Sequence, residues 1–152
     1  MIRLGTLADM STASRVFRDA SLSNEGDREN LLAHPEYLVL DPEGLAEGRT
    51  YVAELDGQLA GFATWSETPG GVELEDLFVD PAYMRRGIAT ALVRHVVDVL
   101  QRRGVRRLEV VATLYALDFY RAAGFTGCGP AMTEFGTALR MELAIPGGRP
   151  AR

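Results

Sequence analysis

Two arginines and a glycine stand between a strand-like segment and a helix-like segment in the middle of the chain. The strand-like segment ends at Pro81, which has no N–H to donate to a sheet. After Gly87, apolar residues return at helical spacing, at Ile88, Ala91, Leu92, Val96 and Val99. The first N–H groups of a helix lack intrahelical partners and meet the positive end of its dipole, so phosphate oxygens fit there. We therefore expect an anion-binding turn in which Gly87 lets the backbone approach the ligand and Arg85 and Arg86 add positive charge.

Two glutamates lie before this turn, on the predicted strand. Glu73 and Glu75 are two residues apart, so on a regular strand both face one side while Leu74 faces the other. A glutamate with apolar neighbours can have a raised pKa and accept a proton near neutral pH. Either residue is therefore a candidate general base. The alternatives are that both are solvated surface charges, or that a chain of waters carries the proton.

The strands that position these residues are marked by apolar alternation and by turn residues. Strands are expected at 2–4, 50–55, 58–65, 72–79, 105–112 and 135–143. Asp56 and Gly57 form a strong hairpin signal, and Pro69 with the two glycines after it predicts a second turn. The alternation within 72–79 breaks near Asp76 and Leu77, where we expect a bulge or a local bend.

Helices are expected between these strands. The apolar spacing predicts helices from Asp9 or Ser11 to about Ala20, at 29–33, from 87 to about 103, and at 114–123. The segment 21–27 is expected to be a polar loop, and the segment 34–48 to be irregular. Gly104 suits the C-terminal end of the third helix. The order strand, helix, strand over 72–112 predicts a parallel pair inside an otherwise antiparallel sheet.

The composition limits the class of protein. The chain has 152 residues, of which 47% are apolar and 24% charged, which suits one globular domain. We expect this domain over 1–145 and a flexible tail over 146–152. The net charge of −5 argues against nucleic-acid binding and mildly favours cationic substrates. No apolar run is long enough to span a bilayer, no His/Cys cluster has metal-ligand spacing, and the single cysteine, Cys128, suits a reducing cytoplasm.

The stretch 72–92 resembles motif A of the GNAT superfamily, the acyl-CoA-dependent N-acetyltransferases. That motif ends in Gln or Arg, two variable residues, Gly, one variable residue, and Gly or Ala, and it cradles the coenzyme A pyrophosphate on backbone amides. Met84 stands in place of the usual Gln or Arg, and Arg85 stands where many members have glycine, so a left-handed backbone there would be strained. The resemblance implies that the pyrophosphate is bound by Met84, Arg85, Arg86, Gly87, Ile88, Ala89 and Thr90.

A second stretch resembles motif B of the same family. The matching residues are Ala116, Phe119, Tyr120, Gly124 and Phe125. Thr113 stands where the family usually has Asn, so a side-chain amide contact to the coenzyme is lost or replaced by a hydroxyl. The two motifs and the strand–helix order extend the resemblance to about Leu143. They imply coenzyme contacts by Thr113 and Phe119.

The resemblance also implies catalytic roles. Phe78 and Val79 would offer main-chain groups of a splayed strand end to the pantetheine. Tyr120 would lie near the coenzyme sulfur as general acid, since a phenol with a pKa of about 10 is protonated at neutral pH. The alternative is a tyrosine that packs its ring and bonds water. The base matches Glu73 in histone-type members and Glu75 in the spermidine/spermine type, so both stay open.

The sequence thus predicts one α/β domain of GNAT type, a mixed, mostly antiparallel sheet flanked by helices on both faces. The predicted reaction is direct transfer of an acetyl group from acetyl-CoA, a cosubstrate, to a primary amine of a small molecule or peptide, since no convincing nucleophile is visible. The alternative is a relative that binds acyl-CoA as a sensor or structural module and releases no free thiol. We expect a cytoplasmic protein without nucleic-acid, membrane or metal partners. The acceptor and the oligomeric state stay open, and a homodimer agrees with the resemblance.

Overall fold

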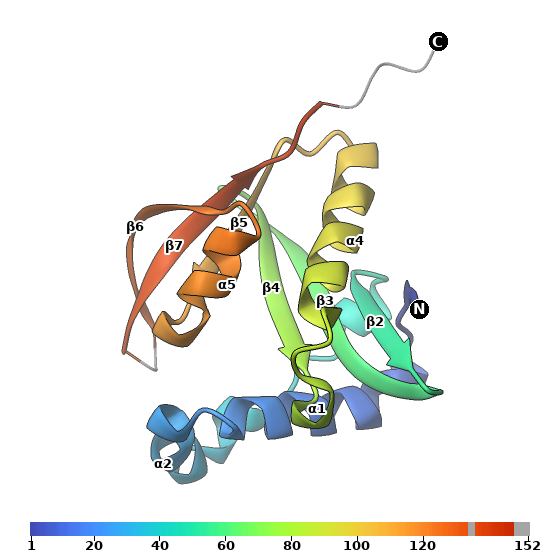
Figure 1. The fold of residues 1–152 in the computed structure, drawn as a ribbon, viewed down its shortest axis with the longest axis vertical. Coiled ribbons are helices and arrows are strands. Elements are labelled where there is room, and N and C mark those ends of the chain that lie inside the picture. The colour runs from blue at the N-terminus through green and yellow to red at the C-terminus, as the bar shows by residue number, and fades with distance from the viewer. Residues whose placement is uncertain (134–135, 148–152) are drawn as a thin grey trace.

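A single sheet forms the centre of the molecule in the computed structural model, which describes residues 1–133 and 136–147 (Figure 1). Across these residues the sheet has seven strands in the order β1-β2-β3-β4-β5-β7-β6. The strands span Ile2–Leu4 (β1), Thr50–Leu55 (β2), Gln58–Thr68 (β3), Gly71–Val79 (β4), Arg107–Ala112 (β5), Thr126–Thr133 (β6) and Gly136–Ala144 (β7). Every neighbouring pair is antiparallel except β4 and β5, which are parallel. The predicted mixed, mostly antiparallel sheet is confirmed.

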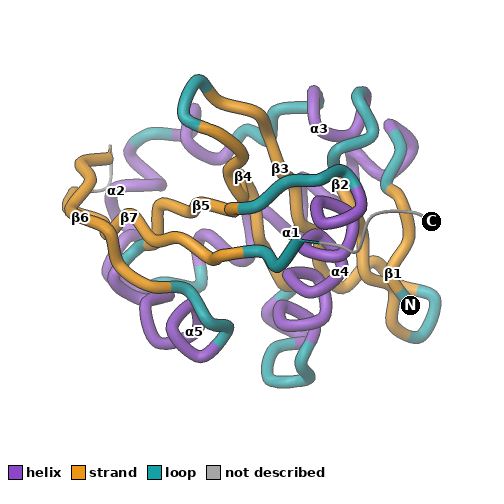
Figure 2. Tube along the Cα trace, turned by 90° about the horizontal axis from the view of Figure 1, so that it is seen from above, coloured by secondary structure: helices purple, strands orange, loops and turns teal. Residues whose placement is uncertain are grey.

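Helices cover both faces of this sheet, as predicted. They span Met10–Leu22 (α1), Glu25–Ala33 (α2), Glu43–Ala46 (α3), Ile88–Arg102 (α4) and Leu117–Ala122 (α5). On one face α1 packs against β3 and β4, and on the other face α4 packs against β2, β3 and β4. Figure 1 shows α1 and α2 together at the bottom of the view, apart from α4 and α5. Seen from above in Figure 2, β1 and β6 lie at opposite ends of the sheet.

An apolar cluster lies under each helical layer. Leu92, Val96 and Leu100 of α4 are inaccessible to solvent in the larger cluster. Ala13 and Val16 of α1 are inaccessible to solvent in the smaller one. Full burial of a large apolar side chain contributes about 1.5–3 kcal/mol, so both layers are firmly attached to the sheet. The ends of the strands between them are therefore a stable support for a site.

Strand β4 contains a bulge. Thr64 of β3 pairs with Asp76, and the next residue, Trp65, pairs with Leu74, which leaves Glu75 as an extra residue. The bulge expected from the broken alternation is present, one residue earlier than predicted. Because the strand is not regular here, simple alternation does not place its two glutamates on a common face.

Three elements differ from the sequence-based expectation. Helix α3 lies inside the segment 34–48, which was expected to be irregular, and the Asp41 carboxylate accepts a hydrogen bond from the Glu43 N–H at its start at 2.9 Å. Helix α2 begins at Glu25, inside the segment predicted to be a polar loop, because acidic residues in its first turn favour a helix N-terminus despite Gly26. Strand β6 was not predicted, because Gly127, Gly129 and Pro130 are weak strand formers. Pairing with β7 holds β6 in place.

The remaining boundaries agree closely with expectation. The β2–β3 hairpin is confirmed, since Asp56 and Gly57 have φ values of 54° and 75°, as a type I′ turn requires. Phe135 of the predicted last strand and residues 148–152 of the predicted tail lie outside the described residues. The Pro146 carbonyl at the start of that tail accepts a hydrogen bond from Gln101 Nε2 at 2.9 Å. Within the described ranges, no helix combines the length and apolar character that crossing a membrane would require.

Candidate active site

Strands β4 and β5 separate after two paired positions. β4 pairs with β5 at Val72 and Glu73, whereas β5 continues beside β7 over its whole length. Over residues 74–79, β4 pairs with β3, and its other edge has no strand partner among the described residues. Such an edge presents free N–H and C=O groups, with which an extended ligand can pair as an added strand would.

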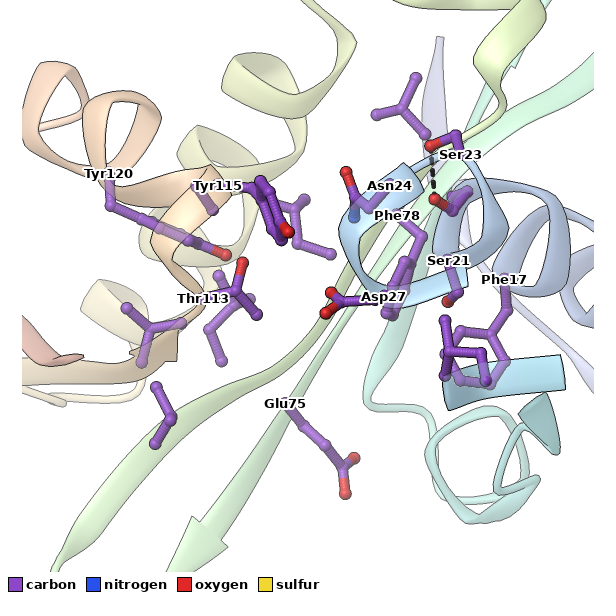
Figure 3. Close-up of a pocket in the computed structure, with 18 of the residues that line it drawn as sticks. Phe17, Ser21, Ser23, Asn24, Asp27, Glu75, Phe78, Thr113, Tyr115 and Tyr120 are labelled. Atoms are coloured by element: carbon purple, nitrogen blue, oxygen red, sulfur yellow. Dashed lines mark hydrogen bonds between the residues drawn. The ribbon is translucent and has the colours of Figure 1, made fainter. Parts of the chain in front are cut away.

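A cavity of about 380 Å³ opens at this separation (Figure 3). Its walls along the sheet are apolar and include Leu74, Leu77, Phe78, Val79, Val110 and Val111. Its other walls carry polar groups and include Ser21, Ser23, Asn24, Asp27, Thr113, Tyr115 and Tyr120. Figure 3 shows Asp27 and Ser21 on the side of α1 and α2, opposite Thr113, Tyr115 and Tyr120. The cavity can thus hold a partly apolar ligand with polar groups at its ends.

Glu75, the extra residue of the bulge, lines this cavity. Its side chain is 42% exposed, and its carboxylate lies 3.8 Å from Arg49 Nη1. Partial burial raises the pKa of Glu75, Arg49 opposes that rise, and three nearby acids add to it, namely Asp41, Glu73 and Glu43. Figure 3 shows the Glu75 side chain at the edge of the cavity, pointing away from Tyr120. A carboxylate with a raised pKa beside a cavity can accept a proton near neutral pH. Glu73, the other predicted base, does not line the cavity.

Asp76 follows Glu75 and was not predicted as a site residue. It pairs across the strands with Thr64, whose hydroxyl lies 2.7 Å from that of Thr50 in the buried interior. Burial, followed by the charge of Glu75, raises the pKa of Asp76 to about 6, although the Thr64 hydroxyl donates a hydrogen bond that opposes this rise. Strand register alone brings Asp76 to Thr64, so the sequence carries no direct signal for this acid.

Tyr120 lies on α5, and its hydroxyl points into the cavity (Figure 3). The residue is 7% exposed, and its ring makes edge-to-face contacts with Phe119 and Phe125, with centroids 5.2 and 5.3 Å away. Burial raises the pKa of the phenol above its ordinary value, so the proton stays on the oxygen at working pH. In the part of the chain that the structure describes, no group is hydrogen-bonded to this hydroxyl. It remains available as a donor to a ligand.

The turn after β4 has a left-handed backbone at two positions and leads directly into α4. Arg85 and Gly87 have left-handed backbones, with φ values of 64° and 75°. Helix α4 begins at Ile88, and no side chain of the described residues caps its N-terminus, so its first N–H groups stay open. The strain expected for a non-glycine residue at Arg85 is therefore present.

Contacts from two other elements fix this turn. Asp80 is buried, and its carboxylate accepts hydrogen bonds from Ala82 N at 3.0 Å and from Arg15 Nη2 at 3.1 Å. Gly61 of β3 lets α4 approach the sheet, because a Cβ there would lie 3.2 Å from Ile88 Cγ2 of α4 and 2.8 Å from the Phe78 carbonyl oxygen of β4. Strand β3 and helix α1 thus hold the turn and the start of α4 in position.

The predicted site residues fall into two neighbouring groups and two outliers. The group that lines the cavity is Glu75, Phe78, Val79, Met84, Thr113 and Tyr120. The group that forms the turn is Arg85, Arg86, Gly87, Ile88, Ala89 and Thr90. Glu73 and Phe119 belong to neither group, and Phe119 supports the Tyr120 ring. Asp27 and Tyr115 line the cavity without having been predicted, because an acid in a polar segment and an aromatic beside a motif carry no positional signal.

No metal centre accompanies this arrangement among the described residues. No three His, Cys, Asp or Glu side chains in those ranges are grouped in a way that could hold a metal ion.

Comparisons with known proteins identify the family. The model of the acetyltransferase (GNAT) family matches residues 15–125. Streptothricin acetyltransferase from Streptomyces lavendulae is 38% identical over 107 residues, which cover 66% of this chain and 57% of that protein. The chain spans about half the length of the curated relatives that it matches.

Solved structures share the fold. The ribosomal-protein-S18-alanine N-acetyltransferase from Escherichia coli superposes with a TM-score of 0.73 at 23% identity, covering 100% of this chain and 98% of that one. The PaiA N-acetyltransferase from Thermoplasma acidophilum, solved in complex with coenzyme A, gives a TM-score of 0.72 at 18% identity, with coverage of 95% and 98%. Because the family model matches most of the sequence, the chain belongs to the acetyltransferase (GNAT) family.

Proposed function

We propose that this protein transfers an acetyl group from acetyl-CoA to a primary amine by direct attack of the amine on the thioester. The observation that carries the proposal is that Glu75 and Tyr120 line one cavity, where β4 and β5 separate. Met84 lines the same cavity and leads directly into the anion-binding turn. A proton acceptor, a proton donor and a phosphate site thus share one strand end, which suits acyl transfer from a phosphate-bearing carrier.

The residues present suit coenzyme A. Its pyrophosphate would meet the open N–H groups at the start of α4. A Cβ on Gly87 would have no atom of the described residues within 4 Å, which leaves space beside the backbone. Its pantetheine amides would pair with the unpaired edge of β4 at Phe78 and Val79. Met84 and Arg85 change side chains but leave these backbone groups in place. The coenzyme A bound by the Thermoplasma acidophilum relative supports the same ligand class.

Glu75 takes the proton that the amine must lose. An amine is largely an ammonium ion at neutral pH, and an ammonium ion has no lone pair with which to attack a thioester. Glu75 lines the cavity, and its raised pKa brings it closer to the working pH. The neutral amine then forms the C–N bond, the C–S bond breaks, and the second amine proton leaves with solvent.

Tyr120 donates to the leaving sulfur. Its hydroxyl points into the cavity and keeps its proton, so it can donate a hydrogen bond to the sulfur as negative charge develops and can then protonate the thiolate, after which solvent returns a proton to the phenolate. Tyr120→Phe is expected to lower kcat about a hundredfold while the Kd for acetyl-CoA stays unchanged. Tyr115→Phe, which removes the other phenol of this wall, is the control. Full turnover by Tyr120→Phe would refute the role.

The protein is proposed to act in the cytoplasm on a soluble amine. Its single cysteine, Cys128, is exposed and free, which suits a reducing compartment. The net charge of −5 favours a cationic acceptor over nucleic acid. Assembly as a homodimer is compatible with this proposal and can be measured by sedimentation.

The test combines calorimetry with thiol release. Titration with acetyl-CoA should give saturable binding, and a panel of amines should then release free thiol above the background of the protein alone. An acyl-CoA sensor would bind the coenzyme and release no thiol with any amine. Absence of acetyl-CoA binding at millimolar concentration would overturn both the transferase and the sensor hypothesis.

A further inference from the structure

Asp27 places an unpaired carboxylate in the cavity. It lies on α2 and points into the space between that helix and the opposite wall (Figure 3). Asp27 is half-buried, whereas Gly26 and Arg28 beside it are exposed. Among the described residues, no side chain or backbone group is bonded to its carboxylate, and the nearby Arg28 instead donates to the Leu22 carbonyl at 3.2 Å. Asp27 lies in the first turn of α2, where the helix dipole favours a carboxylate, and its side chain is free to bind a cationic group in the cavity.

The charges that line the cavity are all negative. Asp27 and Glu75 line it, and no Lys, Arg or His among the described residues does so. Arg49 lies beside Glu75, but outside the cavity, and three further acids surround that glutamate. The cavity therefore attracts cations.

The chemistry of the proposed reaction cancels only one positive charge. The attacking ammonium gives its proton to Glu75 and becomes a neutral amide. Asp27 would then face a neutral product in a partly apolar cavity if the acceptor carried a single amine. A second cationic group on the acceptor stays charged throughout the reaction and keeps the Asp27 carboxylate paired.

We propose that Asp27 binds a second positive charge on the acceptor, which makes the substrate class small amines that carry two cationic groups. This inference rests on the proposed acetyl transfer and assigns its acceptor. One amine of such a molecule lies between Glu75 and Tyr120, and the other cationic group lies at Asp27. The neutral polar residues beside Asp27, Ser21 and Asn24, offer further oxygens to its N–H groups.

The test uses three acceptors of equal chain length that differ only in the distal group. Butane-1,4-diamine has a cationic end, n-butylamine a neutral one and 4-aminobutanoate an anionic one. Calorimetry on protein saturated with coenzyme A measures their binding without turnover. The diamine should bind about tenfold more tightly than butylamine, and 4-aminobutanoate should bind least.

Substitution of the carboxylate assigns the preference to one residue. Asp27→Asn keeps the size of the side chain and should reduce diamine binding about tenfold, to the level of butylamine, whose binding stays unchanged. Glu29→Gln, on the same helix but exposed and outside the cavity, should leave all three affinities unchanged. In the unsubstituted protein, raising the salt concentration from about 0.05 to about 0.5 M should shrink the preference for the diamine.

The outcomes separate this inference from the proposed function. Equal binding of diamine and butylamine overturns the inference, even if both release thiol from acetyl-CoA. A diamine preference that survives Asp27→Asn also overturns it. Diamine binding that depends on Asp27, without any thiol release, overturns the proposed transfer and leaves the cation site standing.

Discussion

The two sides of the cavity are built in different ways. The side that we propose binds the coenzyme, called here the coenzyme side, is one continuous segment, from the end of β4 through the turn to the start of α4, and it presents mainly backbone groups. The side that we propose binds the acceptor, called here the acceptor side, gathers side chains from α1, α2, the β4 bulge and α5, which lie far apart in the sequence. A site made of backbone groups keeps its binding groups when side chains are replaced, whereas a site made of side chains loses or gains binding groups with each substitution.

The coenzyme side is also held more firmly to the rest of the fold than the acceptor side. On the coenzyme side, the buried Asp80 holds the turn to α1 through Arg15, and the first turn of α4 packs closely on Gly61. On the acceptor side, Tyr115 lies over Gly26 of α2, where a Cβ would come within 1.8 Å of its hydroxyl, yet Tyr115 itself is 59% exposed. Coenzyme recognition is therefore expected to be rigid and general, and acceptor recognition adaptable and particular.

The largest expected effect is on acetyl-CoA affinity and tests the backbone groups of the turn directly. Gly87→Glu forces a side chain onto a left-handed backbone and places a carboxylate where the phosphates would bind. We expect the affinity for acetyl-CoA, measured by calorimetry, to fall more than about a hundredfold, because like charges repel at this point.

The matched control lies at the other end of the same helix. Gly104 also has a left-handed backbone, with a φ of 80°, and a Cβ there would likewise have no atom of the structurally described part of the chain within 4 Å. Gly104→Glu should cost a similar free energy of unfolding, about 1 kcal/mol, and leave acetyl-CoA binding intact. Equal loss of binding in both variants would mean that strain in α4, rather than the turn, controls affinity.

The same contrast explains what the sequence could predict. The turn at Gly87, the helix after it and the parallel strand pair depend on local spacing, and the structure has all three. The β2–β3 hairpin depends on the dipeptide Asp56 and Gly57 and is equally local. Features that depend on neighbours in the chain can therefore be predicted from the sequence, because the residues that cause them lie within a few positions of one another.

Features set by distant neighbours were predicted less well. The sequence could not choose between the two glutamates, because the bulge that sets Glu75 apart depends on the pairing of β4 with β3. The pKa of Asp76 depends on burial and on the hydrogen bond from Thr64 of another strand, and Asp27 becomes a site candidate only because α2 lies against the cavity. Strand β6 has poor intrinsic propensity and exists through its pairing with β7.

The next largest effect separates the two glutamates. Glu75→Gln should lower kcat/KM about tenfold to a hundredfold, because Glu75 lines the cavity, whereas Glu73→Gln should change it little. The pKa of Glu75 is raised, and a base must be ionised, so kcat/KM should rise with pH through a pKa above the ordinary glutamate value of 4.5. That limb of the pH–rate profile should vanish in Glu75→Gln. If both variants kept the unsubstituted profile, neither glutamate would be the base.

A smaller effect concerns the free energy of unfolding, which should change in opposite directions when Asp76 and Asp80 are replaced by asparagine. Folding raises the pKa of Asp76 from 3.8 to about 6, so the folded state holds the proton more tightly and stability falls as pH rises from about 4 to 6. Asp76→Asn should therefore raise the free energy of unfolding by up to about 3 kcal/mol at pH 7 and change it little below pH 4. Urea denaturation at the two pH values measures the difference.

Asp80→Asn on the coenzyme side is the contrasting control. Asp80 is buried but paired with Arg15 and with the Ala82 N–H, so its charge is compensated. Its replacement should lower the free energy of unfolding at pH 7 by about 1–2 kcal/mol. A loss of stability in Asp76→Asn as well would show that the Asp76 charge, like that of Asp80, supports the fold.

The smallest effect asks how far the coenzyme side depends on side chains at all. Arg85 and Asp56 are the non-glycine residues with positive φ among the described residues, at 64° and 54°. Replacing either by glycine relieves strain but adds freedom to the unfolded chain, so each free energy of unfolding should change by less than about 1 kcal/mol. Arg85→Gly alone removes a charge beside the phosphate site and should weaken acetyl-CoA binding roughly two- to fivefold at low salt, an effect that salt screens. If Arg85→Gly and Asp56→Gly bind acetyl-CoA equally well at low salt, the turn holds its ligand through backbone groups alone, and the contrast between the two sides of the cavity is complete.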